Sequence, residues 1–487
     1  MNKPYFRYLA RSYKYLILFF FAVYLSLSLL YAMSSDGPFR TYEMAKIAGI
    51  LSVCFCYVLP VVLFTFVHKR SSADVYHALP ISRKEHRITI LLFCFAVTFG
   101  YFAVTCLTGY ILYNIHDVSV LSLLGMLGYM AFTIITLLAV NSALYLIGNN
   151  ILDGLVILTA YTAFFLPCLI AESIITERMV AGATALLSVP AAYLLSPAVI
   201  LMHNFFNLAS YHSGIQSGFS VLYLVFGIAW LVLGWFGLKQ EFDHRKSERA
   251  EAISDHPLAY PTVINMYSIL MLTVIGSSVV TAFATDAILS YLALLVCYTA
   301  GTFLYRRKIE VDLKRTGIFV LEAVITLGLM ALCWNTKGFG LAYHYALDQG
   351  YVLVYEYNAA VEGNDLGRHY ETDSDVSVDF SLYLSTSELD RYPELLKLLE
   401  SKRHLAIESF YQKYQGWSEN LRVYNRDRYS DRIINDYSYH PQVLFTEEEL
   451  NYISQYTDVT VHDYENFEKW NGNDIPLNEY LSHRGDN

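Results

Sequence analysis

Long apolar runs separated by short polar segments dominate the first 335 residues. A helix needs about 20 apolar residues to cross a bilayer. Nine runs reach this length and predict nine transmembrane helices: 15–33, 47–67, 88–112, 121–147, 153–171, 219–238, 263–285, 287–305 and 317–335. A tenth run, 184–206, is interrupted by Pro190 and Pro197. We expect 172–215 to form a re-entrant or surface-lying helical pair between the fifth and sixth spans.

The distribution of Lys and Arg predicts the orientation of these spans. With nine spans and a cytoplasmic N-terminus, about 18 basic residues fall on the cytoplasmic side and about four outside, as the positive-inside rule requires. Counting 184–206 as a full span would move the basic clusters at 239–249 and 306–315 outside. We therefore expect a multi-pass protein of the bacterial cell membrane, with residues 341–487 outside the cell.

Residues 341–487 have the pattern of a soluble α+β domain. Residues 351–357 and 376–384 alternate as strands do, and helix-start signals at 387–390 and 446–449 precede helical stretches at 392–411 and 449–456. The expected fold is thus a mainly α-helical polytopic membrane protein with a C-terminal extracytoplasmic α+β domain.

Composition supports this division. The chain is 55% hydrophobic and 16% charged, which is outside the range of soluble globular proteins. Residues 341–487 contain 27 Asp and Glu against 12 Lys and Arg, whereas the remainder is basic. All seven cysteines lie in apolar runs, which favours a packing role over metal or redox chemistry. Nothing in the charge pattern indicates a nucleic-acid partner.

The first residues allow two interpretations. Basic residues recur at helical spacing across 3–14, which predicts a short amphipathic helix in the membrane interface. The alternative is an ordinary basic flank that orients the first span. No cleavable signal peptide is expected.

Candidate chemistry is sparse. The chain has neither a Walker phosphate-binding loop nor a glycine-rich dinucleotide turn, so ATP-driven work would require an ATPase on another polypeptide. Polar groups inside spans are costly, and Asn141 and Glu322 are candidates for an intramembrane polar site. Glu172 and Asp286 lie at span ends, where solvation explains them. We predict no catalytic residue, no metal site and no cofactor in this chain.

Two further polar groups have ordinary explanations. His203, Asn204, Asn207 and His212 lack an acidic or cysteine partner, so a polar lining is favoured over a metal site. The alternating acids Glu371, Asp373, Asp375 and Asp379 could bind calcium or a cationic peptide, although the solvated face of a strand is the more common reading.

The most informative polar segment is 68–87, HKRSSADVYHALPISRKEHR, between the second and third spans. It carries basic residues, a break at Leu79 and Pro80, and a helix-start signal at Ser82. Such a loop can hold a short helix on the cytoplasmic face, where a partner protein would contact it.

Residues 74–87, DVYHALPISRKEHR, resemble the signature of permease subunits of type-2 ATP-binding cassette (ABC) exporters from Gram-positive bacteria. The basic N-terminal segment, six spans with a re-entrant pair between the fifth and sixth, and the Leu195-Ser196-Pro197 element are also similar to that family. The resemblance covers residues 1 to about 245. It implies a permease core at 1–245, three additional spans at 246–340 and the acidic domain at 341–487.

The resemblance also implies partners and a mechanism. A separate ABC ATPase would carry ATP and Mg²⁺, and a second permease subunit would form a homo- or heterodimer within membrane lipid. The implied ATPase-coupling loop comprises Tyr76, His77, Leu79, Pro80, Ile81, Ser82, Arg83 and Arg87. An apolar anchor pair, Leu79 and Ile81, suits a helix-in-groove contact whose charged rim is formed by Arg83, Lys84 and Arg87.

Three functions remain open from the sequence. The first is export of an amphipathic substrate such as an antimicrobial peptide, an antibiotic or a lipid-linked compound. The second is an antibiotic-sensing or resistance complex without bulk transport. The third is a membrane-embedded glycosyltransferase, against which the short loop 34–46, with Asp36 and Glu43 unpaired, argues.

Overall fold

The computed structural model is mostly helical. It describes residues 2–487 except 35–39, 78, 114–118, 182–190, 210–219, 253, 255, 283–284, 307–312, 344–350, 362–375, 386–390, 412–418, 428–432, 440–444, 464–474 and 477–487. The chain forms two compact units, Met1–Leu169 with Ala191–Tyr267 and Ile170–Pro190 with Ser268–Asn487. Each unit is described by itself.

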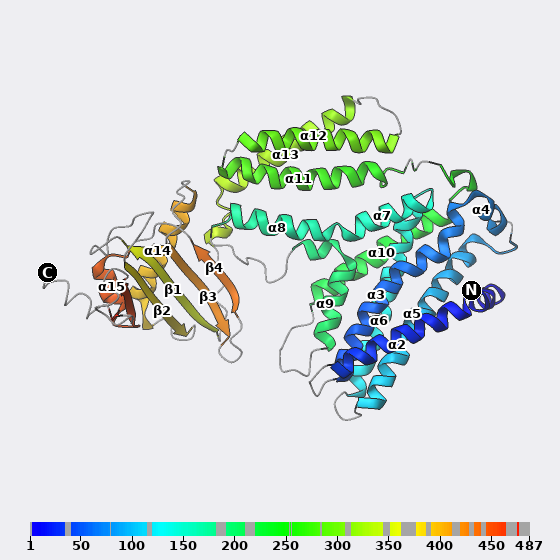
Figure 1. Ribbon diagram of the computed structural model, residues 1–487, viewed down its shortest axis with the longest axis horizontal. Helices are drawn as coiled ribbons and strands as arrows, with labels where there is room; N and C mark the ends of the chain where they lie inside the picture. Colours follow the sequence, from blue (N-terminus) through cyan, green and yellow to red (C-terminus); the bar gives the residue numbers. More distant parts are fainter. Residues whose placement is uncertain are drawn as a thin grey trace. The chain divides into compact units, whose positions relative to one another are not determined.

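The first unit contains the helices that run from the N-terminus to the end of the basic stretch near 249. They are α1 (Lys3–Ser12), α2 (Lys14–Ser34), α3 (Arg40–Phe64), η1 (Thr65–His68), α4 (Arg70–His77), α5 (Arg83–Tyr113), α6 (Val120–Ile147), α7 (Ile151–Ala163), η2 (Ala191–Leu195), α9 (Pro197–Ala209), α10 (Val221–Asp243) and η4 (Ser247–Arg249). Figure 1 shows α3, α5 and α6 side by side, with α10 against α6. Two helices cross the boundary between the units: α8 (Phe165–Met179) and α11 (Tyr260–Ala282).

Within the described residues, eight helical segments are long and apolar enough to cross a membrane. All eight contain or closely overlap a predicted span, and the fifth runs from Ile151 to Thr176 through α7 and α8. The predicted span at 287–305 falls on α12 (Thr285–Arg306), whose described apolar part, Ile288–Phe303, is shorter than the other eight. By length and composition the chain is therefore a multi-pass membrane protein.

The described part of 172–215 differs in local form from the expected re-entrant helical pair. Residues 172–176 continue the fifth span, and the described part of 191–209 is a short 3₁₀ turn followed by one helix, α9. Helix α9 packs against α3, α6 and α10. The side chain of Asn204 donates to the carbonyl of Ser220 at 2.9 Å and accepts from its backbone N–H at 3.0 Å, so it fixes the start of α10. His212 lies outside the described residues.

Close packing between α6 and α10 requires glycine at position 234. A Cβ on Gly234 would lie 2.8 Å from both the Cγ2 and the backbone nitrogen of Val140. Small residues let transmembrane helices approach this closely. One turn toward the C-terminus, a Cβ on Gly237 would lie 3.4 Å from the Cβ of Ala143, which is an ordinary contact.

The second unit contains three apolar helices followed by strands and helices. Its remaining elements are α13 (Leu313–Asn335), η5 (Leu341–Tyr343), β1 (Tyr351–Val361), β2 (Val376–Ser385), α14 (Pro393–Tyr411), β3 (Glu419–Asp427), β4 (Ile433–Tyr439), α15 (Glu447–Ile453), β5 (Val459–Asp463) and β6 (Ile475–Pro476). The described strands form one antiparallel sheet in the order β4-β3-β1-β2-β5-β6. Figure 1 labels β4, β3, β1 and β2 of this sheet. The predicted strands at 351–357 and 376–384 lie within β1 and β2. As predicted from the sequence, Thr446 and Glu449 form a capping box at the start of α15.

One apolar core joins this sheet to the helices of its unit. Phe380 and Leu382 of β2 are buried with Leu399 of α14 and Leu450 of α15. The same core includes Cys333 near the end of α13, together with residues 179–181. The C-terminal segment is thus packed onto helical residues of its own unit.

A tight turn follows α13. Lys337, Gly338, Phe339 and Gly340 all have positive φ, a conformation that L-residues other than glycine rarely adopt. A Cβ on Gly338 would lie 2.7 Å from Val180 Cγ2, so both the backbone and the space require glycine there. The turn is further fixed by Lys337, whose ammonium donates to the Glu408 carboxylate of α14 and to the Tyr343 hydroxyl.

Candidate functional site

The segment between the second and third spans folds as a short helix followed by a turn and a new helix. Helix α3 ends in the 3₁₀ turn η1, and α4 follows after Lys69. The Ser82 hydroxyl accepts the backbone N–H of Glu85 at 3.2 Å and the Ser82 carbonyl accepts that of His86 at 2.9 Å, so Ser82 caps α5 as its sequence signal indicated. The side chain of His77 lies outside the described residues.

Aromatic rings attach α4 to the helix bundle. The Tyr76 ring lies 4.2 Å from Phe66 and 5.8 Å from His86, measured between ring centroids. The same His86 ring lies 4.7 Å from Tyr5 and shares a 2.9 Å hydrogen bond with the Tyr5 hydroxyl. Phe242 of α10 completes this aromatic cluster, at 5.7 Å from His86. The cluster therefore connects α1, η1, α4, α5 and α10.

Arg83 connects the loop to the end of α10. Its Nη1 donates to the backbone carbonyls of Asp243 and Arg245, both at 2.9 Å. The last carbonyls of a helix have no partner within the helix and carry partial negative charge. A cation in this position stabilises the end of α10 and holds it against the first turn of α5.

Arg87 lies inside the unit, in contrast to the expected position on a charged rim. It is 2% exposed, and its Nη2 lies 3.2 Å from Asp243 Oδ2. Its guanidinium also lies 5.4 Å from the centre of the Trp235 ring. Because these groups belong to its own chain, Arg87 joins α5 to α10 and is not available to a partner protein.

A second buried arginine, Arg245, was not singled out from the sequence. Its guanidinium donates to the carbonyls of Leu146 and Gly148 at the end of α6, the latter at 2.8 Å, and lies 3.5 Å from His68 Nδ1. Burial lowers the pKa of Arg245 to about 10, so the group stays charged at neutral pH. A basic residue shortly after an apolar run is also the pattern of an ordinary basic flank, so no feature of the sequence distinguishes Arg245.

The outer side of the loop is largely polar. Lys69, Arg70, Asp74 and Lys84 are exposed. Val75 is 65% exposed, whereas the expected anchors Leu79 and Ile81 are half-buried and Ile81 packs against the core of its own unit. Pro80 is exposed at the turn. Sequence reasoning missed Val75, although an apolar residue one position before Tyr76 was visible there.

The two candidate intramembrane polar residues have different environments. Asn141 is fully buried on α6, and its Nδ2 donates to the carbonyl of Cys56 on α3 at 3.0 Å. Glu322 lies on α13, and its Oε2 is shielded without a hydrogen-bond partner among the described residues. Asn141 lies in the first unit and Glu322 in the second.

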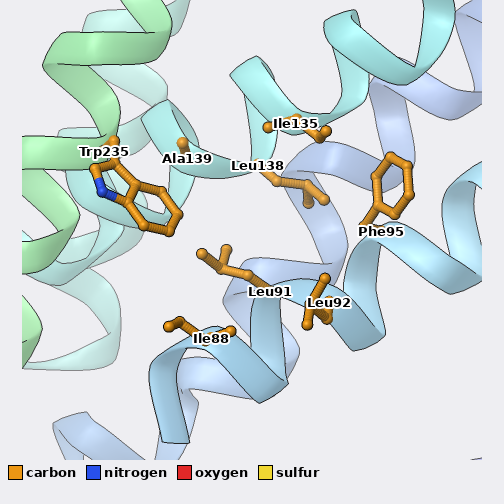
Figure 2. A pocket seen from close by; sticks show the side chains of 8 residues that line it. All are labelled: Ile88, Leu91, Leu92, Phe95, Ile135, Leu138, Ala139 and Trp235. Atoms are coloured by element: carbon orange, nitrogen blue, oxygen red, sulfur yellow. The ribbon is translucent and has the colours of Figure 1, made fainter. Parts of the chain in front are cut away.

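An apolar pocket of about 190 Å³ lies between α5, α6 and α10. Figure 2 shows Ile88, Leu91, Leu92 and Phe95 of α5 facing Ile135, Leu138 and Ala139 of α6, with Trp235 of α10 at one side. Such a pocket suits the hydrocarbon chain of a ligand.

The described residues contain no group of three or more His, Cys, Asp or Glu side chains arranged to hold a metal ion. The acids Glu371, Asp373 and Asp375 lie outside the described residues, as does the side chain of Asp379. No known protein family, curated protein or solved structure matches this chain.

Proposed function

We propose that this chain is the membrane-spanning permease subunit of an ABC transporter. A separate ATPase docks on the loop 69–85 and supplies the energy. The observation that carries the proposal is the two-sided character of this loop. Its outer side presents Val75 among exposed charged residues, and its inner side is bonded to the ends of several helices.

A force on α4 would reach the bundle through these inner contacts. The Tyr76 ring contacts Phe66 in η1, which directly follows α3, and His86 at the start of α5. Arg83, also at the start of α5, binds the end of α10. Displacing α4 therefore costs contacts with two spans, and the second of these is bonded to α10. Movement of the loop and movement of the bundle are coupled on physical grounds, because packed elements of this kind shift between discrete arrangements.

The resemblance of residues 74–87 to type-2 ABC permeases supports the same assignment. The cargo that suits the chain is amphipathic, such as an antimicrobial peptide, an antibiotic or a lipid-linked compound, and it would move between two permease subunits. Under this proposal 341–487 is a soluble α+β domain outside the cell, whose excess of acidic residues attracts a cationic cargo. Clearance or sensing of an antibiotic, without bulk transport, is the alternative within the same class.

The test of the assignment is recruitment of the ATPase. Val75→Asp places a charge at the exposed apolar position, and we expect it to abolish co-purification of an ATPase subunit from native membranes. Val75→Thr keeps the shape and is the matched control. Because position 75 is exposed, we expect both variants to match the parent chain in membrane insertion and in yield. Undiminished co-purification of Val75→Asp, or no ATPase with the parent chain, would contradict the proposal.

The role of the C-terminal segment is best tested by point substitutions. Deleting 341–487 would uncover Cys333 and Val180, which share its core, and would confuse loss of folding with loss of function. Glu394→Gln with Glu448→Gln neutralises two exposed acids without touching that core. If the domain captures a cationic peptide, this pair weakens peptide binding while ATPase recruitment is retained.

A further inference from the structure

A second cavity lies at the end of α10, where the chain leaves the apolar span 221–243. Its volume is about 540 Å³, within the range of small-ligand sites. The residues that line it are mostly basic or amide-bearing: Phe236, Lys239, Gln240, Glu241, His244, Arg245, Arg249 and His256. The aromatic cluster and the Arg87–Asp243 pair use none of Lys239, Gln240 and Arg249.

The charge balance of the cavity favours an anion. Lys239, Arg245 and Arg249 are cations, and Glu241 is the single acid among the lining residues. Glu241 Oε1 already lies 3.2 Å from His256 Nε2. Lys239 and Arg249 are exposed, while Arg245 is buried with its guanidinium on the carbonyls of Leu146 and Gly148. The lining therefore offers two exposed cations near a third, fixed one.

The apolar surface next to the cavity identifies the kind of anion. Phe236 lines the cavity and is 63% exposed, and Leu233, one turn earlier on α10, is exposed to the same degree. Lys239 lies four residues after Trp235, so the two share a face of the helix. The Trp235 ring lines the apolar pocket of Figure 2. A ligand here would meet apolar side chains along the span and cations at its end.

We propose that this cavity binds the phosphate of an anionic phospholipid headgroup, with the acyl chains against the exposed apolar face of α10. Basic pockets between transmembrane helices at the membrane surface recognise such headgroups, because the cation meets the phosphate where the helix leaves the hydrocarbon. The proposal is independent of whether an ATPase docks on the loop, since none of its residues belongs to that contact surface.

The test compares lipids on the full-length chain. Delipidated protein is titrated with phosphatidylglycerol or with phosphatidylcholine of the same acyl chains, and the bound lipid is counted by native mass spectrometry. We expect the parent chain to prefer phosphatidylglycerol. Lys239→Gln with Arg249→Gln removes the two exposed cations and should weaken phosphatidylglycerol binding about tenfold, with phosphatidylcholine unchanged.

The control variant is Lys69→Gln with Arg70→Gln, which removes two exposed cations that do not line the cavity. It should keep the preference for phosphatidylglycerol. Equal binding of the two lipids by the parent chain, or equal losses in both double variants, would overturn the proposal. Inorganic phosphate at matched concentration separates a soluble anion from a lipid: competition as strong as that of phosphatidylglycerol itself would overturn the lipid assignment.

Discussion

The side-chain amide of Asn141 on α6 donates to the backbone carbonyl of Cys56 on α3, four residues before Pro60. In a regular helix that carbonyl accepts the N–H of residue 60, but proline has none. An unpaired carbonyl inside a membrane is costly. Asn141 therefore replaces the missing backbone hydrogen bond, and its place inside a span has a structural explanation.

This relationship predicts a rescue. Asn141→Leu leaves the Cys56 carbonyl unpaired and should lower the unfolding free energy by about 1 kcal/mol, since hydrogen bonds between membrane helices average ~0.6 and reach ~1.7 kcal/mol. In an Asn141→Leu background, Pro60→Ala supplies the backbone N–H and should recover most of the loss. Unfolding in mixed micelles measures both the loss in unfolding free energy and its recovery. Additive effects of the two substitutions would contradict this account.

The Arg87–Asp243 pair makes a second prediction. Arg87→Leu leaves the partly buried Asp243 carboxylate without its cation and should cost about 3 kcal/mol of unfolding free energy. The double variant Arg87→Leu with Asp243→Leu removes both charges and should be more stable than Arg87→Leu alone. Lys84→Leu on the same helix is the control, because Lys84 is exposed. A double variant less stable than Arg87→Leu would refute the pairing as the source of the cost.

Packing of α6 against α10 predicts different outcomes for two glycines on one helix. Gly234→Ala forces a Cβ within 2.8 Å of the Val140 backbone nitrogen and should destabilise the unit by about 1–3 kcal/mol. Gly237→Ala meets only an ordinary contact and should be tolerated. Thermal unfolding of the two purified variants gives the comparison. Equal midpoints would show that the helices can separate without cost.

The Lys337–Glu408 contact predicts a pH dependence for docking of α14. The hydrogen bond that the Lys337 ammonium donates to the Glu408 carboxylate lowers the pKa of Glu408 below 4.5 and raises the pKa of Lys337 above 10.5. The carboxylate's contribution is thus complete above pH 4.5 and is lost as the pH falls through the lowered pKa. The contribution of the ammonium is complete below pH 10.5 and is lost as the pH rises through the raised pKa. Partial exposure limits the pair to under about 1 kcal/mol.

Trp334 can report this dependence. Its ring lies 4.9 Å from Tyr411 and 5.7 Å from Phe410, both on α14. In a variant that retains Trp334 as its single tryptophan, the fluorescence change on denaturation should shift to lower denaturant below pH 4.5. Glu408→Gln should remove most of this acid shift. If the Glu408→Gln variant still shifts to lower denaturant below pH 4.5 by the same amount, other carboxylates are the cause of the shift.

The orientation proposed for the chain is testable by labelling. In a cysteine-free background, Val75→Cys and Tyr383→Cys place a thiol at exposed positions on the loop and on the sheet. A membrane-impermeant maleimide should label Tyr383→Cys in intact cells and Val75→Cys only after the cells are opened. The reverse pattern would exclude a cytoplasmic loop and with it the docking of an ATPase there.

The sequence alone determined the place of eight of the nine predicted spans, the helix start at Ser82 and the capping box at Thr446. These depend on local composition and on hydrogen bonds between residues three or four apart, which a sequence displays directly. Residue type also marked Asn141 as unusual, because polar groups within spans are rare.

Only the tertiary structure decided what those residues do. The partners of Asn141, Arg83, Arg87 and Arg245 lie 85 to 177 residues away in the chain. No local pattern encodes such distances, since they follow from which helices pack together. Whether a basic residue near a span faces a partner protein or a buried carboxylate is fixed by that packing.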